Sequence, residues 1–291
     1  MNLHASMNLH AGTVRARLSD AIKKSEPEFD LARTSLLIAM EEYPQLPAEP
    51  HLLRLDALAE ATKDRLDDET AGPIVLGEVI RTLFEREGLK GNQEAYYDPR
   101  NSFLNDVLDR RLGIPLTLGI ILLEVGWRLD LPLEGVNFPS HFLVRYRGAA
   151  ENLLIDPFEG GLIRFENQAQ EVLDKQYGGT VRMQPAFLRA VTKRDIIQRL
   201  LLNLKGLYVS VRDDRRALAT VERLLLLLPD APGELRDRGM LLLRLGRRSE
   251  AREQLQGYID FAPRAADAAR IRSLVHRLDR GDESPMDGFG E

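Results

Sequence analysis

The stretch from residue 113 to 131 carries apolar side chains at nearly every position. Leucine, isoleucine and valine recur there at helical spacing, and apolar residues fill most of the positions between them. Pro115 favours a helix start, because proline has no N–H to leave unpaired at a first helical position. A helix that is apolar on nearly all sides is typical of the centre of a domain. The pattern therefore predicts a buried helix that begins at Pro115.

After this helix the apolar pattern changes to short runs that are typical of strands. Residues 141–146 and 152–156 form two such runs with a turn between them, and residues 162–165 form a third. A short helix is expected at 167–176. Upstream, residues 12–90 show apolar stripes at helical spacing. Together these patterns predict an α+β domain that is mostly helical and holds a small antiparallel sheet.

The C-terminal third repeats with a period of 34 residues. The matched pairs are Tyr208 with Leu242, Ala217 with Ala251, and Pro229 with Pro263. This is the period of tetratricopeptide repeats, in which each unit is a pair of helices. We therefore expect an all-α domain of about two and a half repeats after the first domain.

These patterns predict four regions. They are an N-terminal extension with a first helix at 1–27, the α+β domain at 28–180, an entirely helical repeat domain at 186–280, and a loose tail at 281–291.

Composition excludes several kinds of chemistry. The 291 residues include no cysteine, which rules out disulfides, thiolate metal sites and a cysteine nucleophile. No run of apolar residues is long enough to span a membrane, and the N-terminus lacks the pattern of a signal peptide. We expect a cytoplasmic protein with no membrane contact, no cofactor and no metal.

The order of helix, strand with His141 and strand with Asp156 resembles the transglutaminase-like, or papain-like, core. In that family a glycine near the helix start and a proline after its end stand nineteen residues apart, as Gly113 and Pro132 do here. The resemblance implies that His141 and Asp156 are the catalytic histidine and aspartate. It also implies that Pro115 occupies the position of the nucleophilic cysteine.

A narrower resemblance covers the chain from about residue 28 to its end. The wording DPRNS-x-LN-x-VL-x-RR-x-GIP, then GV-x-x-P-x-HFLVR, then IDPF-x-GG, is similar to that of the bacterial SirB-type family. The activity that this family implies is poorly defined. Its architecture is a transglutaminase-like domain followed by tetratricopeptide repeats.

The missing thiol weakens the catalytic interpretation. Such enzymes need a thiolate at the helix start and a histidine to take its proton. Thr117 is expected to face away from Pro115, because two residues turn a helix by about 200°. Ser140 is expected to point to the opposite side of the strand from His141. A His141–Asp156 pair that activates water directly remains an alternative, as does a core histidine satisfied by the aspartate.

Polar residues just before the central helix are candidates for the mouth of a pocket. Asp98, Arg100 and Asn101 stand there with Pro115, although turns and helix caps favour the same residue types. A metal site would need Glu124 or Glu159 to join the histidine and aspartate, so none is expected.

The repeats also carry a set of basic residues, Arg215, Arg216, Arg244, Arg247 and Arg248. A solvated repeat surface explains them better than nucleic-acid binding does, because no nucleic-acid motif accompanies them. The sequence thus favours a non-catalytic interaction or scaffold protein, with a degenerate transglutaminase-like domain and repeats that bind a protein partner. A regulatory role fits this hypothesis. The alternative is a hydrolase or peptidase that uses His141 and Asp156 without a cysteine.

Overall fold

The computed structural model describes residues 3–67, 70–149 and 152–281, with side chains from residue 12 onward. The chain divides into two compact units, Met1–Leu200 and Leu201–Glu291. The first is α+β and mostly helical, and the second is all-α, which confirms the predicted fold class. The tail expected at 281–291 lies outside the described residues except for Gly281.

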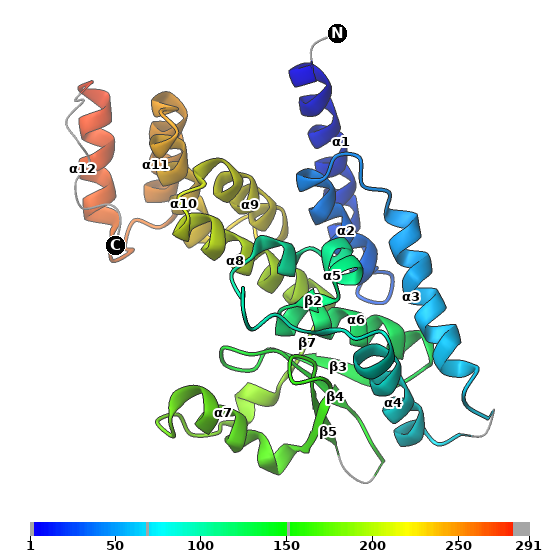
Figure 1. Cartoon of the computed structure of the whole chain (residues 1–291). Helices are drawn as coiled ribbons and strands as arrows, with labels where there is room; N and C mark the ends of the chain where they lie inside the picture. Colours follow the sequence, from blue (N-terminus) through cyan, green and yellow to red (C-terminus); the bar gives the residue numbers. More distant parts are fainter. Residues whose placement is uncertain (1–2, 68–69, 150–151, 282–291) are drawn as a thin grey trace. The chain divides into compact units, whose positions relative to one another are not determined.

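Unit 1 begins with helices that lie on one side of a sheet (Figure 1). They are α1 (Leu3–Lys23), α2 (Leu31–Glu42), α3 (Ala48–Lys63), α4 (Gly72–Ile80) with a π-helical continuation (Arg81–Arg86), α5 (Leu104–Arg110) and α6 (Pro115–Arg128). Two later helices, α7 (Ala169–Tyr177) and α8 (Lys193–Ser210), follow the strands.

The sheet of unit 1 has five antiparallel strands in the order β6-β5-β4-β3-β7. Their bounds are β3 (Leu133–Val136), β4 (Leu143–Tyr146), β5 (Leu153–Asp156), β6 (Leu162–Phe165) and β7 (Ala190–Val191). A separate parallel pair joins β1 (Lys90–Gly91) to β2 (Leu112–Gly113). The three predicted strands are present as β4, β5 and β6.

The strand β7 corrects one expectation. The segment 186–280 is not entirely helical, because Ala190 and Val191 pair with Val136 and Gly135 of β3. Two residues are too few to show the alternation by which a strand is recognised in sequence. From residue 195 to 277, within the described part of the chain, no strand interrupts the helices.

Helix α6 is the buried centre of unit 1, as its sequence predicts. Pro115 occupies its first turn, and the Thr117 hydroxyl accepts the Ile114 N–H, which closes the helix start. The helix packs against α2, α3 and α4 on one side and against β3 and β4 on the other. Gly119 faces the ring of Phe142, so α6 lies directly on the sheet.

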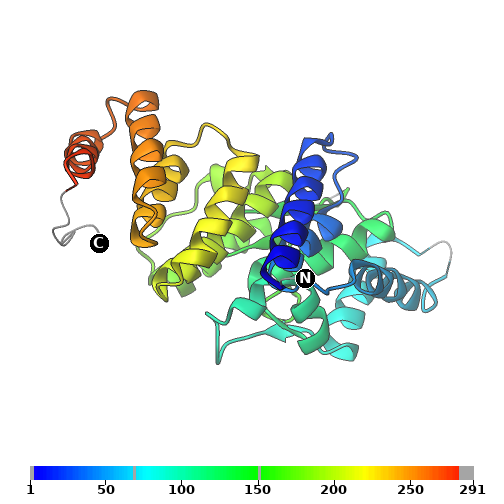
Figure 2. The same ribbon diagram turned by 90° about the horizontal axis from the view of Figure 1, so that it is seen from above.

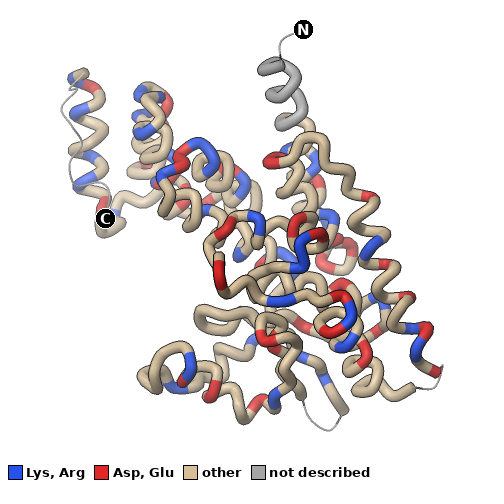
Figure 3. Tube along the Cα trace, viewed as in Figure 1, with Lys and Arg blue, Asp and Glu red and all other residues tan. Residues whose placement is uncertain are grey.

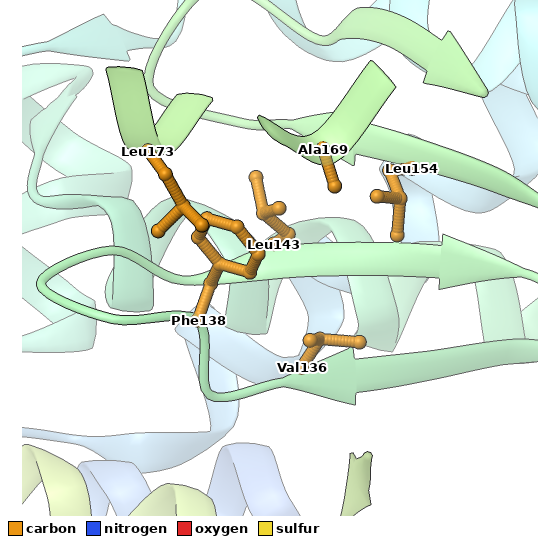
Figure 4. Close-up of a cluster of buried hydrophobic side chains, with 6 residues drawn as sticks. All are labelled: Val136, Phe138, Leu143, Leu154, Ala169 and Leu173. Carbon is orange, nitrogen blue, oxygen red and sulfur yellow. The ribbon is translucent and has the colours of Figure 1, made fainter. Parts of the chain in front are cut away.

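A second apolar layer lies on the opposite face of the sheet. Leu143 of β4 and Leu154 of β5 pack there with Ala169 and Leu173 of α7 (Figure 4). Val136 and Phe138 complete this cluster. The sheet is therefore covered on both faces, by α6 on one and by α7 on the other.

Unit 2 contains the repeats. Its helices after α8 are α9 (Asp214–Leu227), α10 (Pro232–Arg244), α11 (Arg248–Phe261) and α12 (Ala268–Asp279), and Figure 2 shows α10 and α11 side by side. Both ends of α9 and α11 are offset by the 34 residues of the sequence repeat. Ala217 and Ala251, which match in that repeat, are both fully buried where the helices pack.

Candidate functional site

A hydrogen bond joins His141 to Asp156. The Nε2 atom of His141 lies 2.9 Å from Oδ1 of Asp156. Only 13% of the histidine side chain and 4% of the aspartate side chain are exposed. Asp156 shares a face of β5 with Leu154, the face that α7 covers, and His141 stands in the turn just before β4. The contact predicted from the sequence is therefore present.

The loop after β5 fixes the carboxylate of Asp156. Its Oδ1 atom also accepts the backbone N–H groups of Phe158 at 3.1 Å and Glu159 at 3.2 Å. Gly160 and Gly161 both have positive φ, which glycine adopts freely, so the chain turns sharply back into β6. A carboxylate oxygen with three donors is held in one orientation, and it holds the imidazole in turn.

A tight turn before β4 places His141. Its backbone N–H donates to the carbonyl of Phe138, and Ser140 adopts a positive φ of 52°. The guanidinium of Arg199 donates to the side chain of Asn137 at 3.1 Å and to the Phe138 carbonyl at 3.4 Å. Arg199 therefore holds the turn from outside, and burial lowers its pKa from the usual value.

A cavity of about 320 Å³ opens around this pair. Its walls come from the start of α6, the turn before β4, the β5–β6 connection, α7 and the loop after β1. The lining residues are Gln93, Tyr96, Pro115, Ser140, His141, Asp156, Phe158, Glu159, Arg164, Val172, Lys175 and Gln176. Pro115 thus faces the same space as the histidine and the aspartate.

The two hydroxyls considered near Pro115, those of Thr117 and Ser140, both have hydrogen-bond partners of their own. Thr117 is fully buried, and its Oγ1 donates to the carbonyl of Asn101 at 2.7 Å. The expectation that Ser140 points away from the pocket is wrong, because Ser140 lies in the turn rather than in a strand and lines the cavity. Its Oγ lies 2.5 Å from the Tyr177 hydroxyl.

Three of the four residues proposed for the pocket mouth lie elsewhere. Only Pro115 lines the cavity. Asp98 caps the short 3₁₀ turn Pro99–Ser102 and pairs with Arg100, whose hydrogen bond lowers the pKa of Asp98. Asn101 is completely buried, and it donates to the carbonyls of Ala95 and Tyr96. These residues shape the loop that carries Tyr96 into the cavity wall.

Comparison with known proteins matches each of the two parts of the chain to a family model. Residues 49–202 match the model of the transglutaminase-like superfamily, and residues 204–276 match that of the tetratricopeptide repeat. A UPF0162 protein of Xylella fastidiosa strain 9a5c is 38% identical over 256 residues, which cover 87% of this chain and 90% of the relative. The chain belongs to the UPF0162 family, within the transglutaminase-like superfamily.

Two further relatives are similar over a smaller share of the chain. A UPF0162 protein of Vibrio cholerae is 32% identical over 200 residues, covering 68% of this chain and 74% of the relative. F-box only protein 21 of Homo sapiens is 32% identical over 135 residues, covering 46% of this chain and 22% of that protein. No solved structure matches the chain.

The two glutamates considered for a metal site are engaged elsewhere in this family member. Glu124 accepts the Ala32 N–H at 2.9 Å and pairs with Arg128 on the far side of α6. Burial raises its pKa. Glu159 lines the cavity but pairs with Lys175 at 2.9 Å. Among the residues whose side chains are described, no three potential ligands come together as a metal site needs.

Several residues of the cavity wall were not predicted from the sequence, and three of them matter most for its chemistry. Tyr96, Phe158 and Arg164 were not singled out, although all three lie close in sequence to a recognised motif. Arg164 was detectable, because alternation along β6 places it on the same face as Leu154 and Asp156. The Tyr96 side chain contacts Phe158 edge to face at 5.9 Å, and burial raises the pKa of its hydroxyl.

The repeat unit has a groove of its own. Residues of α8 and α10 line it, namely Lys205, Val209, Asp237, Met240, Leu241 and Arg244. The basic residues noted in the sequence lie on α9, at the end of α10 and at the start of α11. Figure 3 shows basic and acidic positions interleaved along the chain. Arg216 pairs with Asp213, Arg244 with Asp214 and Arg247 with Glu250. This interleaving fits a solvated repeat surface.

Within the described residues, no helix combines the length and apolar character that crossing a bilayer requires.

Proposed function

We propose that this chain is a non-catalytic interaction protein of the SirB type, located in the cytoplasm. Its transglutaminase-like domain keeps a binding pocket, and its repeats bind a protein partner. One observation carries the proposal. Pro115 stands at the start of α6, facing the His141–Asp156 pair, in a chain without cysteine. A proline has no group that a histidine could activate as a nucleophile.

The groove of unit 2 supports the proposal that the repeats bind a protein partner. Val209 is 38% exposed, and it lies in the groove with Met240 between charged residues at the rim. Apolar anchors surrounded by polar groups are typical of protein-binding grooves. Tetratricopeptide repeats generally mediate such contacts.

Pull-downs with point variants test whether the groove of unit 2 binds a protein partner. The intact chain with Val209→Glu or Met240→Glu should lose a partner that the unaltered chain captures. Arg252→Glu, on the exposed surface of α11, serves as the control that should keep it. Removing all residues after 185 would be a less suitable test than these point variants, because it would also remove strand β7 from the sheet. A partner retained by both groove variants would argue against the groove.

The open cavity supports an alternative, a hydrolase in which His141 activates water. The pair has the hydrogen bond that such a base requires, and the cavity admits solvent. Purified protein assayed on ester, amide and peptide substrates decides between the two. The proposal expects no turnover above that of the His141→Ala variant. Turnover that disappears in His141→Ala would establish the hydrolase instead.

A further inference from the structure

Arg164 extends from an edge strand of the sheet into the cavity. It lies on β6, directly opposite Leu154 of β5, so its side chain shares the face that carries Asp156. Only 17% of this side chain is exposed. The guanidinium therefore lines the cavity beside the His141–Asp156 pair instead of extending into bulk solvent.

The guanidinium has unused hydrogen-bonding capacity. Its nearest acidic atom is Oδ2 of Asp156 at 3.7 Å, which is beyond hydrogen-bond distance. Arg164 makes no hydrogen bond to any residue that the structure describes. Arg145, on β4 of the same sheet, is different, because it donates to Glu134, Glu166 and the carbonyl of Leu188. Arg164 thus has five N–H donors available to a ligand.

The other charged groups of the cavity already have close partners. Asp156 Oδ1 has its three donors, and Glu159 pairs with Lys175. His141 uses Nε2 for Asp156, and its Nδ1 makes no hydrogen bond within the described residues. The cavity therefore presents one cation with open donors and one further imidazole nitrogen. A ligand that enters the cavity can therefore supply acceptors to this cation.

We propose that this cavity binds a carboxylate group, with Arg164 as its anchor. The planar fork of a guanidinium matches the two oxygens of a carboxylate and can bind them side by side. The rings of Tyr96 and Phe158, in edge-to-face contact, form an apolar wall for the body of the ligand. A cavity of about 320 Å³ holds a small acid or the terminal residue of a chain. The inference rests on the proposed function in treating this cavity as a binding site.

Matched acids and amides test the proposal on the full-length protein. Benzoate and benzamide probe free small acids. N-acetylated tetrapeptides that end in phenylalanine, with a free or an amidated C-terminus, probe chain ends. Dissociation constants are measured by calorimetry or by NMR titration. At least one acid should bind roughly tenfold or more tightly than its amide, because hydrogen bonds between charged groups are the strong ones. A difference in the benzoate pair identifies the ligand as a free small acid. A difference in the peptide pair identifies it as the C-terminus of a chain.

Variants assign the effect to the residue. Arg164→Gln should reduce acid binding roughly tenfold or more and leave amide binding unchanged. Arg164→Lys, which keeps the charge without the fork, should lie between the two and serves if Arg164→Gln fails to fold. Arg147→Gln is the control, because this arginine is 60% exposed, pairs with Glu134 and does not line the cavity. It should change acid binding by less than about threefold.

The outcomes separate this inference from the proposed function. Equal binding of acids and amides, or acid binding that persists in Arg164→Gln, overturns the carboxylate site and leaves the non-catalytic proposal intact. Turnover that depends on His141 overturns the non-catalytic proposal, while a tenfold preference for acids would still support the carboxylate site.

Discussion

Gly119 of α6 lies against the ring of Phe142, the residue that follows His141. A Cβ atom added at Gly119 would come 2.5 Å from Cδ1 and 2.6 Å from Cε1 of that ring. The ring is fully buried, so it has little freedom to move away. The absence of one side chain thus sets how closely the central helix approaches the strand that follows His141.

Replacing Gly119 by alanine should therefore destabilise the protein. Overpacking of a filled core costs about 1–3 kcal/mol, which exceeds the roughly 1 kcal/mol that alanine gains over glycine in a helix. Gly77→Ala in α4 is the matched control, because a Cβ there meets no atom within 4 Å. Chemical denaturation should show the control to be more stable than the parent. A stabilised Gly119→Ala variant would refute this account of the packing.

Glu124 should make stability depend on pH. Burial raises the pKa of this carboxyl in the folded state, and hydrogen bonds from Arg128 and Ala32 oppose that rise. The folded state then binds the proton more tightly than the unfolded state, so stability falls as pH rises from the ordinary glutamate pKa through the raised one. Glu124→Gln removes this titration.

The unfolding free energy of Glu124→Gln minus that of the parent should therefore increase as pH rises from the ordinary glutamate pKa through the raised one. Denaturation curves at several pH values measure it, with Glu60→Gln at an exposed position of α3 as the control. A difference that shrinks as pH rises would show that the hydrogen bonds outweigh burial at this carboxyl.

Lys205 should stabilise the repeat unit. Its Nζ lies 2.8 Å from Glu234 and 2.8 Å from Asp237, and these carboxylates raise its pKa although burial acts against them. Lys205→Met leaves Glu234 without its cation and leaves Asp237 with Arg236 alone, which should cost about 1–3 kcal/mol. Thermal unfolding measures the loss. Arg252→Met, which breaks an exposed pair with Asp279, should cost less than about 1 kcal/mol. Equal losses would contradict a special role for Lys205.

The predictable parts of the fold are those with a strong local signal. Helix α6 begins at Pro115 as expected, and the repeat period predicts the offset of α9 and α11. Strands β3 and β7 were missed, the first because glycine interrupts its apolar pattern and the second because it has only two residues. What defines them is pairing with distant residues, which a single sequence does not display.

The candidate site was likewise predicted only in part. His141 and Asp156 were found through motif order, and their contact depends on the turn before β4 and the loop after β5. Asp98, Arg100 and Asn101 were placed wrongly, because residues that cap a turn and residues that line a pocket share the same polar character. Ser140 was misplaced because it lies in a turn with a positive φ, where the alternation of a strand does not apply. Backbone conformation of this kind is invisible in residue types.

We propose that Pro115 occupies the position of a nucleophile and that the surroundings of this position are otherwise intact. Pro115→Cys tests it directly, because the parent chain has no cysteine and the variant has a single thiol. A thiol at a helix start beside a histidine should ionise more readily than a free one. The rate of alkylation by iodoacetamide at pH 7 is compared with that of glutathione and of the double variant Pro115→Cys/His141→Ala. We expect the single variant to react roughly tenfold faster than glutathione, and the double variant to lose most of that gain. A single variant that folds normally but reacts no faster than glutathione would contradict the claim.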